Sequence, residues 1–164
     1  MAQNVLNTHT KLGVAAGVVA ALAIIVPFIG QHEGRSNVPY KDIGGILTVC
    51  YGHTGPDVTL AGVYSDSQCS QMLDSDVKIR ADEVIKVSPE LVNKPFLLAS
   101  TISFVYNIGV GAYEKSSVSA DFKAGKYSDG CKAMLLYTYA GGKYSQGLAN
   151  RRKAEYNICM KGVT

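Results

Sequence analysis

The chain has 164 residues, of which 47% are hydrophobic and 18% are charged, so its composition is that of a globular protein with room for one domain. This composition excludes collagen-like and intrinsically disordered chains. The net charge of +3 is too small to predict a nucleic-acid-binding protein, because such proteins gather many more Lys and Arg on one face. We therefore expect no nucleic-acid partner.

Charge is distributed unevenly along the chain. Residues 1–32 contain a single charged side chain, Lys11, and no acid. Residues 121–164 contain eight basic and three acidic side chains, including the run Arg151–Lys153. This basic region either attracts an anionic surface or forms a solvated helix face, and the sequence favours neither interpretation.

The uncharged run before His32 has the composition of a weak membrane anchor. As a helix, residues 12–30 would be about 28 Å long at about 1.5 Å per residue, which matches the hydrocarbon core of a bilayer. Ten of these nineteen residues are Leu, Ile, Val or Phe, but eight are Gly or Ala and one is Pro. A cleaved signal peptide is the alternative. No small-residue cleavage site follows the run, because Phe28 stands three residues before a cut after Gly30.

We expect three regions from this pattern: an N-terminal tail over residues 1–11, an uncleaved signal-anchor helix over residues 12–32, and an exported domain over residues 33–164. Positive charge precedes the anchor, so the positive-inside rule places the tail in the cytoplasm and the domain in the periplasm. Gly13 and Gly17 have the spacing that packs two membrane helices together, although low hydrophobicity alone also explains the small residues.

The four cysteines, Cys50, Cys69, Cys131 and Cys159, agree with export, because an exported domain can keep disulfides. Their wide spacing does not match a zinc site, and we expect no metal. Three pairings are possible. The local one, Cys50 with Cys69 and Cys131 with Cys159, closes the shortest loops. Four buried free thiols are the alternative.

The exported region predicts a mostly helical α+β domain with a small β-hairpin sheet near its start. After Tyr40, a Gly-Gly turn and alternation over residues 46–51 predict the hairpin. Ser65 and Gln68 have the spacing of a capping box, at the start of a helical period from about 66 to 86. Further helices are predicted over residues 95–109, 117–124, 128–139 and, after a Gly141-Gly142 break, 146–161.

Two carboxylates and a hydroxyl are the candidates for chemistry, since the chain contains no nucleophile elbow, P-loop or H-E-x-x-H motif. Glu33 ends an apolar helix, and apolar surroundings keep a Glu protonated so that it can donate to a leaving oxygen. Asp42, nine residues later in a turn, should stay ionised. Beside the hydroxyl of Thr48, it can hold a water or stabilise positive charge on a sugar ring. Two surface acids at this spacing are also common.

Longer motifs surround these residues. Glu33-Gly34 and the segment PYKDIGGILTVCYGHT from Pro39 to Thr54 resemble the active-site signature of the phage-type lysozymes of glycoside hydrolase family 24. SFVYNIG from Ser103 resembles the family's central helix, and YAGGK with GLANRRKAEYNIC resembles its C-terminal motif. The resemblance implies a lysozyme-like fold.

The resemblance also assigns roles to single residues. It implies that Glu33 is the general acid, Asp42 the partner carboxylate and Thr48 the residue that positions water, with a structural role for His53. The implied activity is that of an endolysin, which hydrolyses the β-1,4 bond between N-acetylmuramic acid and N-acetylglucosamine in bacterial peptidoglycan and so lyses the host cell. No cofactor is implied.

Some members of this branch carry a weakly hydrophobic signal-anchor-release segment, which the first 32 residues resemble. The resemblance implies export by the host secretion machinery and tethering to the host inner membrane through residues 12–30 in an inactive form. Release into the periplasm would follow collapse of the membrane potential. The anchor contains no Cys, so we expect control by position, with residues 25–32 folding as the domain's first helix after release.

Three other functions fit parts of the pattern. A lytic transglycosylase would use the Glu but has no need of Asp42 and Thr48 to hold water. A membrane-anchored peptidoglycan-binding module without catalysis would need none of the three. A lesion-forming protein of the holin type is disfavoured by the single predicted span and the large cysteine-bearing domain.

Overall fold

The structure of the chain, a computed structural model, describes residues 2–42 and 44–163, and for residues 2–15 it describes the course of the helix alone. The chain forms two compact units. The hairpin unit consists of residues 26–79, and the helical unit consists of residues 1–25 and 80–164. Two helices, α1 (Ala2–His32) and α2 (Asp66–Val87), each contribute residues to both units.

The hairpin unit contains the predicted small sheet. Strands β1 (Ser36–Lys41) and β2 (Leu47–Cys50) pair antiparallel, with Tyr40 opposite Thr48 and an irregularity nearer the start of β1. The sheet begins at Ser36, before the hairpin region that the sequence predicted after Tyr40, because Ser36 already pairs with Cys50. The unit's core is a cluster of buried residues from β2, the following loop and α2, namely Val49, Cys50, Val58, Tyr64 and Cys69.

The start of α2 confirms the predicted capping box. The Ser65 N–H donates to Gln68 Oε1 at 2.9 Å, and the Gln68 N–H donates to Ser65 Oγ at 3.2 Å. These reciprocal bonds satisfy amide groups that have no partner inside the helix. The helix therefore begins at Asp66, as the sequence predicted.

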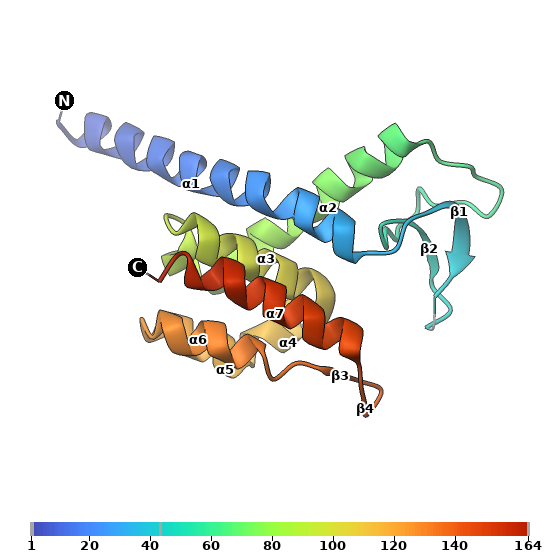
Figure 1. Cartoon of the computed structure of the whole chain (residues 1–164). Helices are drawn as coiled ribbons and strands as arrows, with labels where there is room; N and C mark the ends of the chain where they lie inside the picture. Colours follow the sequence, from blue (N-terminus) through green and yellow to red (C-terminus); the bar gives the residue numbers. More distant parts are fainter. Residues whose placement is uncertain (1, 43, 164) are drawn as a thin grey trace. The chain divides into compact units, whose positions relative to one another are not determined.

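The helical unit is built around α3 (Pro95–Ile108), in which residues 97–105 are all buried. This helix packs against α7 (Gln146–Met160), and Figure 1 shows the two side by side. Three shorter helices and one 3₁₀ turn complete the unit: η1 (Pro89–Leu91), α4 (Val110–Glu114), α5 (Ser117–Lys123) and α6 (Tyr127–Met134). The Cys131–Cys159 disulfide joins α6 to α7.

The predicted helix over residues 128–139 is wrong at its end. Helix α6 stops at Met134, and turn bonds such as Leu136 N–H to the Ala133 carbonyl, 3.2 Å, replace its last part. A second hairpin, β3 (Tyr139–Ala140) and β4 (Lys143–Tyr144), follows where the sequence predicted only a break. Gly141 and Gly142 have φ of +55° and +75°, the left-handed conformation that a two-residue hairpin turn requires.

Both interpretations of the basic C-terminal run are wrong for its two arginines, which are buried. Arg152 and Glu155 have no exposed surface, and Arg151 has 5%. Glu155 Oε1 accepts from Ser103 Oγ at 2.6 Å and from Arg151 Nε at 3.1 Å, while its Oε2 lies 3.1 Å from Arg152 Nε. Arg152 also donates to Asn107 and lies over the Phe104 ring. The arginines therefore hold α7 against α3, and Lys153 alone is exposed.

The N-terminal helix α1 buries one face over its described side chains. Ala21, Ile25 and Ile29, spaced one helical turn apart, have no exposed surface, whereas Val19 is 65% exposed. Among the residues whose side chains the structure describes, no helix combines the length and hydropathy of a membrane span. Residues 12–15 of the predicted anchor, Gly13 included, lie outside that set.

Gly17 of α1 lies very close to backbone atoms of the helical unit. A Cβ at this position would lie 2.3 Å from the carbonyl oxygen of Val92, in the loop after η1. Backbone atoms cannot yield to a side chain without a shift of the helix, so only Gly fits here. This contact explains the glycine at position 17 within a single chain. The pairing of two membrane helices through Gly13 and Gly17, which the sequence suggested, is a separate explanation.

We predict that Glu155→Gln destabilises the protein strongly, because it leaves the charges of Arg151 and Arg152 buried without their carboxylate. Removing one member of a buried ion pair costs about 3–5 kcal/mol. Chemical unfolding should show a loss of this size, and Glu114→Gln, an exposed acid of α4, should show almost none. An equal loss in both variants would contradict the account of α7 packing.

Candidate active site

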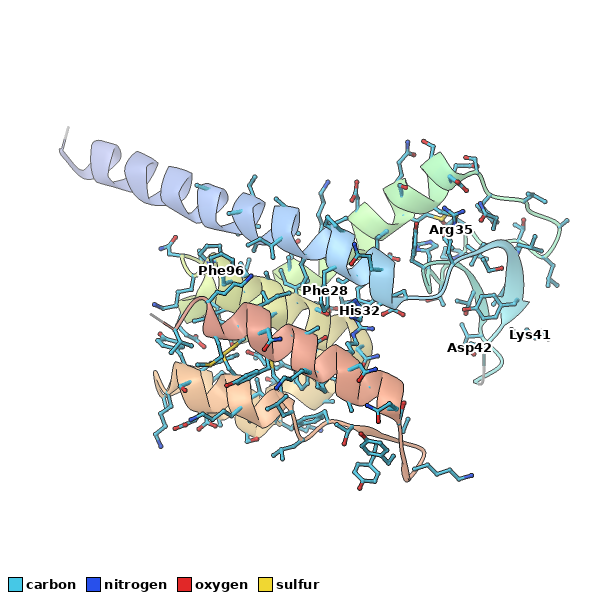
Figure 2. All side chains as sticks on the ribbon, in the orientation of Figure 1. Phe28, His32, Arg35, Lys41, Asp42 and Phe96 are labelled. Atoms are coloured by element: carbon cyan, nitrogen blue, oxygen red, sulfur yellow. A yellow bond between two sulfur atoms is a disulfide. The ribbon has the colours of Figure 1, made fainter. Side chains whose placement is uncertain are left out.

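Glu33 stands directly after the last turn of α1, as the sequence predicted. Its N–H donates to the Ile29 carbonyl at 2.9 Å, which continues the helical pattern by one residue. The preceding turn is fixed by His32, whose ring stacks on Phe28 with centroids 4.1 Å apart. Figure 2 shows both rings on the last turns of the helix. The Glu33 side chain is therefore carried by a regular helix end.

Asp42 and Thr48 are both tied to the backbone of Ile46. Asp42 Oδ1 accepts the Ile46 N–H at 2.8 Å, and the Asp42 N–H donates to the Ile46 carbonyl at 3.0 Å. Thr48 Oγ1 donates to the same carbonyl at 3.0 Å. One residue therefore fixes the carboxylate and the hydroxyl relative to each other, and Figure 2 shows Asp42 beside Lys41 at the hairpin.

The turn between these residues depends on two glycines. Gly45 has φ of +77°, and its N–H donates to the Asp42 carbonyl at 2.9 Å. A Cβ on Gly44 would come within 3.3 Å of Asp42 Oδ1, against the carboxylate itself. Small residues therefore leave this face of the carboxylate open.

Strand β2 is cross-linked to α2 immediately after Thr48. Cys50 forms a disulfide with Cys69, the local pairing among the three that the sequence allowed. Cys50 has φ of +58°, a left-handed conformation that costs a non-glycine residue about 1–3 kcal/mol unless its surroundings hold it. The disulfide and the burial of Cys50 supply that constraint.

His53 forms a second link between the strand region and α2. Its backbone pairs with Val49 through two hydrogen bonds of 2.9 Å. Its ring lies between two carboxylates, with Nδ1 2.8 Å from Asp76 Oδ2 and Nε2 3.1 Å from Asp57 Oδ2. Burial lowers the pKa of His53, but hydrogen bonds and charge attraction from Asp76 and Asp57 outweigh it, so the pKa is raised above 6.5.

The structure places all three predicted site residues in the hairpin unit, with Asp42 and Thr48 on one turn and Glu33 at the end of α1. The carboxylate partners of His53, Asp57 and Asp76, were not predicted from the sequence. Leu73 and Val77 of α2 are buried, and Asp76 lies between them on the same face of the helix. An acid among the buried positions of α2 was therefore the signal that could have indicated a carboxylate with a partner. Among the described residues, no cluster of His, Cys, Asp and Glu is arranged to hold a metal ion.

The family of the chain follows from its similarity to known proteins. The phage lysozyme family model matches residues 30–155, which include all three candidate site residues. The chain belongs to the phage lysozyme family. A relative from bacteriophage PS119, named SAR-endolysin, is 33% identical over 96% of this chain and 95% of its own length. The chain is a lysozyme, a glycoside hydrolase that lyses peptidoglycan.

Solved structures show the same fold. An endolysin from Escherichia coli O157:H7 phage FAHEc1 is 27% identical, with a TM-score of 0.70 over 82% of this chain and 89% of its own. The active form of the P1 phage endolysin Lyz has a TM-score of 0.74 over 92% of this chain and 95% of its own, at 19% identity. The mostly helical, lysozyme-like fold with a small hairpin sheet near its start is therefore confirmed.

The His53 link makes the stability of the lysozyme depend on pH. Because the folded-state pKa is raised, the contribution is fully present below pH 6.5 and is lost as the pH rises through the folded value. We predict that His53→Asn lowers the free energy of unfolding by about 1.5–3 kcal/mol near pH 5.5, the range for hydrogen bonds to charged groups. The difference from wild type should shrink at alkaline pH.

Urea unfolding at several pH values measures this difference. The control is His32→Asn, which removes a histidine at an exposed position of α1 without touching Asp57 or Asp76. A His53→Asn deficit that stays constant from pH 5.5 to alkaline pH would show that packing of the ring, and not its charge, stabilises the hairpin unit.

Proposed function

We propose that Glu33 is the general acid of this lysozyme, Asp42 its partner carboxylate and Thr48 the residue that positions the attacking water. The bond cleaved would be the β-1,4 linkage between N-acetylmuramic acid and N-acetylglucosamine. The observation that carries the proposal is the shared attachment of Asp42 and Thr48 to Ile46. It gives a carboxylate and a hydroxyl the fixed relation that holding one water requires.

The Thr48 hydroxyl is oriented so that its oxygen can accept a hydrogen bond from water. Its hydroxyl proton is directed to the Ile46 carbonyl at 3.0 Å, so the acceptor lone pairs of Oγ1 remain to receive a hydrogen bond. A carboxylate has two oxygens, and the Ile46 N–H fixes one of them at 2.8 Å. Asp42 can thus hold its turn and still present charge to a reacting group.

The reaction requires a proton donor and a stabilised positive charge. Protonation of the glycosidic oxygen by Glu33 would release the leaving sugar as positive charge develops on the ring of the other sugar. Asp42 would stabilise that charge. Water held between Asp42 and Thr48 would add to the anomeric carbon, give its proton to the Asp42 carboxylate and leave a new reducing end. Proton exchange with solvent would then return Glu33 to its acid form and Asp42 to its ionised form.

We predict that Glu33→Gln lowers the release of reducing ends from purified peptidoglycan by about 100-fold or more, since general acid catalysis contributes about 10²–10⁴-fold. Asp42→Asn should lower it by at least about tenfold, because its amide oxygen still accepts the Ile46 N–H while the charge is lost. The control is Asp74→Asn, an exposed acid of α2 in the same unit, with wild-type activity expected.

Product analysis separates this reaction from its alternatives. Cleavage by the wild-type protein without new reducing ends would indicate a lytic transglycosylase. Full activity of Glu33→Gln would contradict the assignment of the acid. Unfolding midpoints of both variants near that of the wild type would show that the losses arise from chemistry.

We further propose that residues 12–30 anchor the enzyme in the host inner membrane after export by the host secretion machinery, with the N-terminus in the cytoplasm. Release would free the enzyme into the periplasm. A relative of 33% identity that bears the name SAR-endolysin supports this, as does the composition of the segment. The likeness to the active form of the P1 endolysin covers 92% of the chain, so the present fold fits the released state.

Two glycines of the segment fit the released state. Gly17 lies against the Val92 carbonyl, and Gly30 lies against Leu73 of α2, where a Cβ would come within 3.4 Å of Leu73 Cδ2. In a bilayer, glycine at these two positions would only lower the hydrophobicity of the anchor segment. In the released enzyme Gly17 would let α1 approach the Val92 backbone closely, whereas a Cβ at Gly30 would make an ordinary van der Waals contact.

We predict that Gly17→Leu inserts into the membrane normally but impairs the released enzyme. Overpacking against the Val92 backbone should cost about 1–3 kcal/mol of stability. The control is Val19→Leu, which adds apolar surface at a site that is 65% exposed. Thermal unfolding of the detergent-free proteins and the timing of host lysis measure the effect.

Delayed lysis together with a lower melting temperature for Gly17→Leu alone is the expected result. Equal melting temperatures for the two variants would contradict the role of Gly17 in the released state. Equal delays of lysis would mean that hydrophobicity alone controls release.

A further inference from the structure

The second hairpin presents two tyrosines on one exposed face of the helical unit. Tyr139 and Tyr144 stand directly opposite each other in the β3–β4 pair, so their side chains project from the same side. Their rings meet edge to face with centroids 5.9 Å apart. They remain 65% and 55% exposed. Figure 1 shows the hairpin in the connection between α6 and α7.

Contacts other than the ring pair also hold the hairpin. At its base, the Ser145 N–H donates to the Thr138 carbonyl at 2.9 Å, and Ser145 Oγ caps α7 by accepting from the Leu148 N–H. At its tip, Gly141 and Gly142 supply the turn. The two rings are therefore carried on a preformed support, with most of their apolar surface in water. Adjacent exposed aromatic rings are typical of a binding surface.

The ring pair suits a ligand with a flat apolar face and polar edges. A pyranose has axial C–H bonds on one face, which pack on the negative face of an aromatic ring, while its hydroxyl and acetamido groups point outward. The Tyr139 and Tyr144 hydroxyls lie at the ring edges. The Tyr144 hydroxyl donates to Gln146 Oε1 at 3.4 Å and can still accept a hydrogen bond from such groups.

Charge around the hairpin fits an anionic glycan. Residues 130–154 contain no Asp or Glu. With Arg151 and Arg152 buried and Lys132 paired with Asp129 at 3.5 Å, the exposed cations that remain in this stretch are Lys143, in the hairpin itself, and Lys153. Peptidoglycan carries carboxylates on its lactyl and peptide groups, so this surface attracts it where an acidic surface would repel it.

We propose that Tyr139 and Tyr144, with Lys143, form a glycan-binding surface that stacks sugar rings of the peptidoglycan strand and holds the enzyme on its polymeric substrate. The inference rests on the proposed function for its ligand, but it assigns no catalytic step to these residues. The hairpin acts on binding and leaves the rate of bond cleavage in the bound complex unchanged.

Co-sedimentation with purified peptidoglycan sacculi tests the surface. It is run on ice with the full-length protein, in wild-type and Glu33→Gln backgrounds. The double variant Tyr139→Ala/Tyr144→Ala should raise the Kd about five- to tenfold. The double Phe variant should bind within about twofold of wild type, because it keeps both rings. Leu136→Ala, at a site that is 73% exposed in the same connection, is the matched control and should bind normally.

Kinetics separate binding from chemistry. The Ala pair should raise the KM for peptidoglycan by the same factor and leave kcat within about twofold. Unchanged Kd and KM in the Ala pair would overturn the proposal. Cleavage by Glu33→Gln would instead overturn the catalytic assignment alone, because the comparison of binding is made in both backgrounds.

A fluorescent reporter tests the surface without removing a ring. The chain contains no Trp, so Tyr144→Trp introduces a single one. Its emission should change saturably on addition of an N-acetylglucosamine tetramer. An unchanged emission would overturn the proposal. A change of emission seen only with vesicles of phosphatidylethanolamine and phosphatidylglycerol would also overturn it and would indicate a membrane contact. A change seen only when the protein concentration is raised would overturn it too and would indicate pairing with a second copy.

Discussion

The attachment of strand β2 to helix α2 is the constraint on which the candidate site depends. A two-stranded sheet is marginally stable alone in water, yet Asp42 directly follows β1 and Thr48 lies in β2. The Cys50–Cys69 disulfide closes a separation of 19 residues, and a loop of this size contributes about 3 kcal/mol. The ring of His53 adds a charged link to α2 through Asp76. The hairpin can therefore hold a carboxylate and a hydroxyl in fixed positions without a large core of its own.

Helix α1 must suit two environments if the proposed release occurs. A weak anchor needs low hydrophobicity, and a packed helix needs close approach to its neighbours. Small residues satisfy both requirements, as the Gly17 contact with Val92 illustrates. The same helix carries Glu33 at its end, so the proposed acid is attached to the segment that would leave the membrane. Under this proposal, release and positioning of the acid are one folding event.

Local patterns predicted most of the fold because they reflect interactions between residues close in sequence. Helical periodicity predicted α2, the almost uncharged run from Pro95 to Gly109 predicted α3, and the spacing of Ser65 and Gln68 predicted the start of α2. The second hairpin was missed because two-residue strands are too short for a pattern, and their pairing depends on the conformations of Gly141 and Gly142. The burial of Arg152 was also missed, since its partner Asn107 lies 45 residues away and no local signal links them. The roles of Glu33, Asp42 and Thr48 remain predictions supported by their placement.

A kinetic double-mutant cycle between Glu33 and Asp42 tests the central claim that the two carboxylates act as one site. The cycle compares peptidoglycan cleavage by Glu33→Gln, Asp42→Asn and the double variant. Groups that act together in one step lose their effect together, so we expect the double variant to be about as slow as the slower single variant. Losses that multiply, with the double variant slower by the product of the two single effects, would show that Asp42 and Glu33 act independently and would contradict the account.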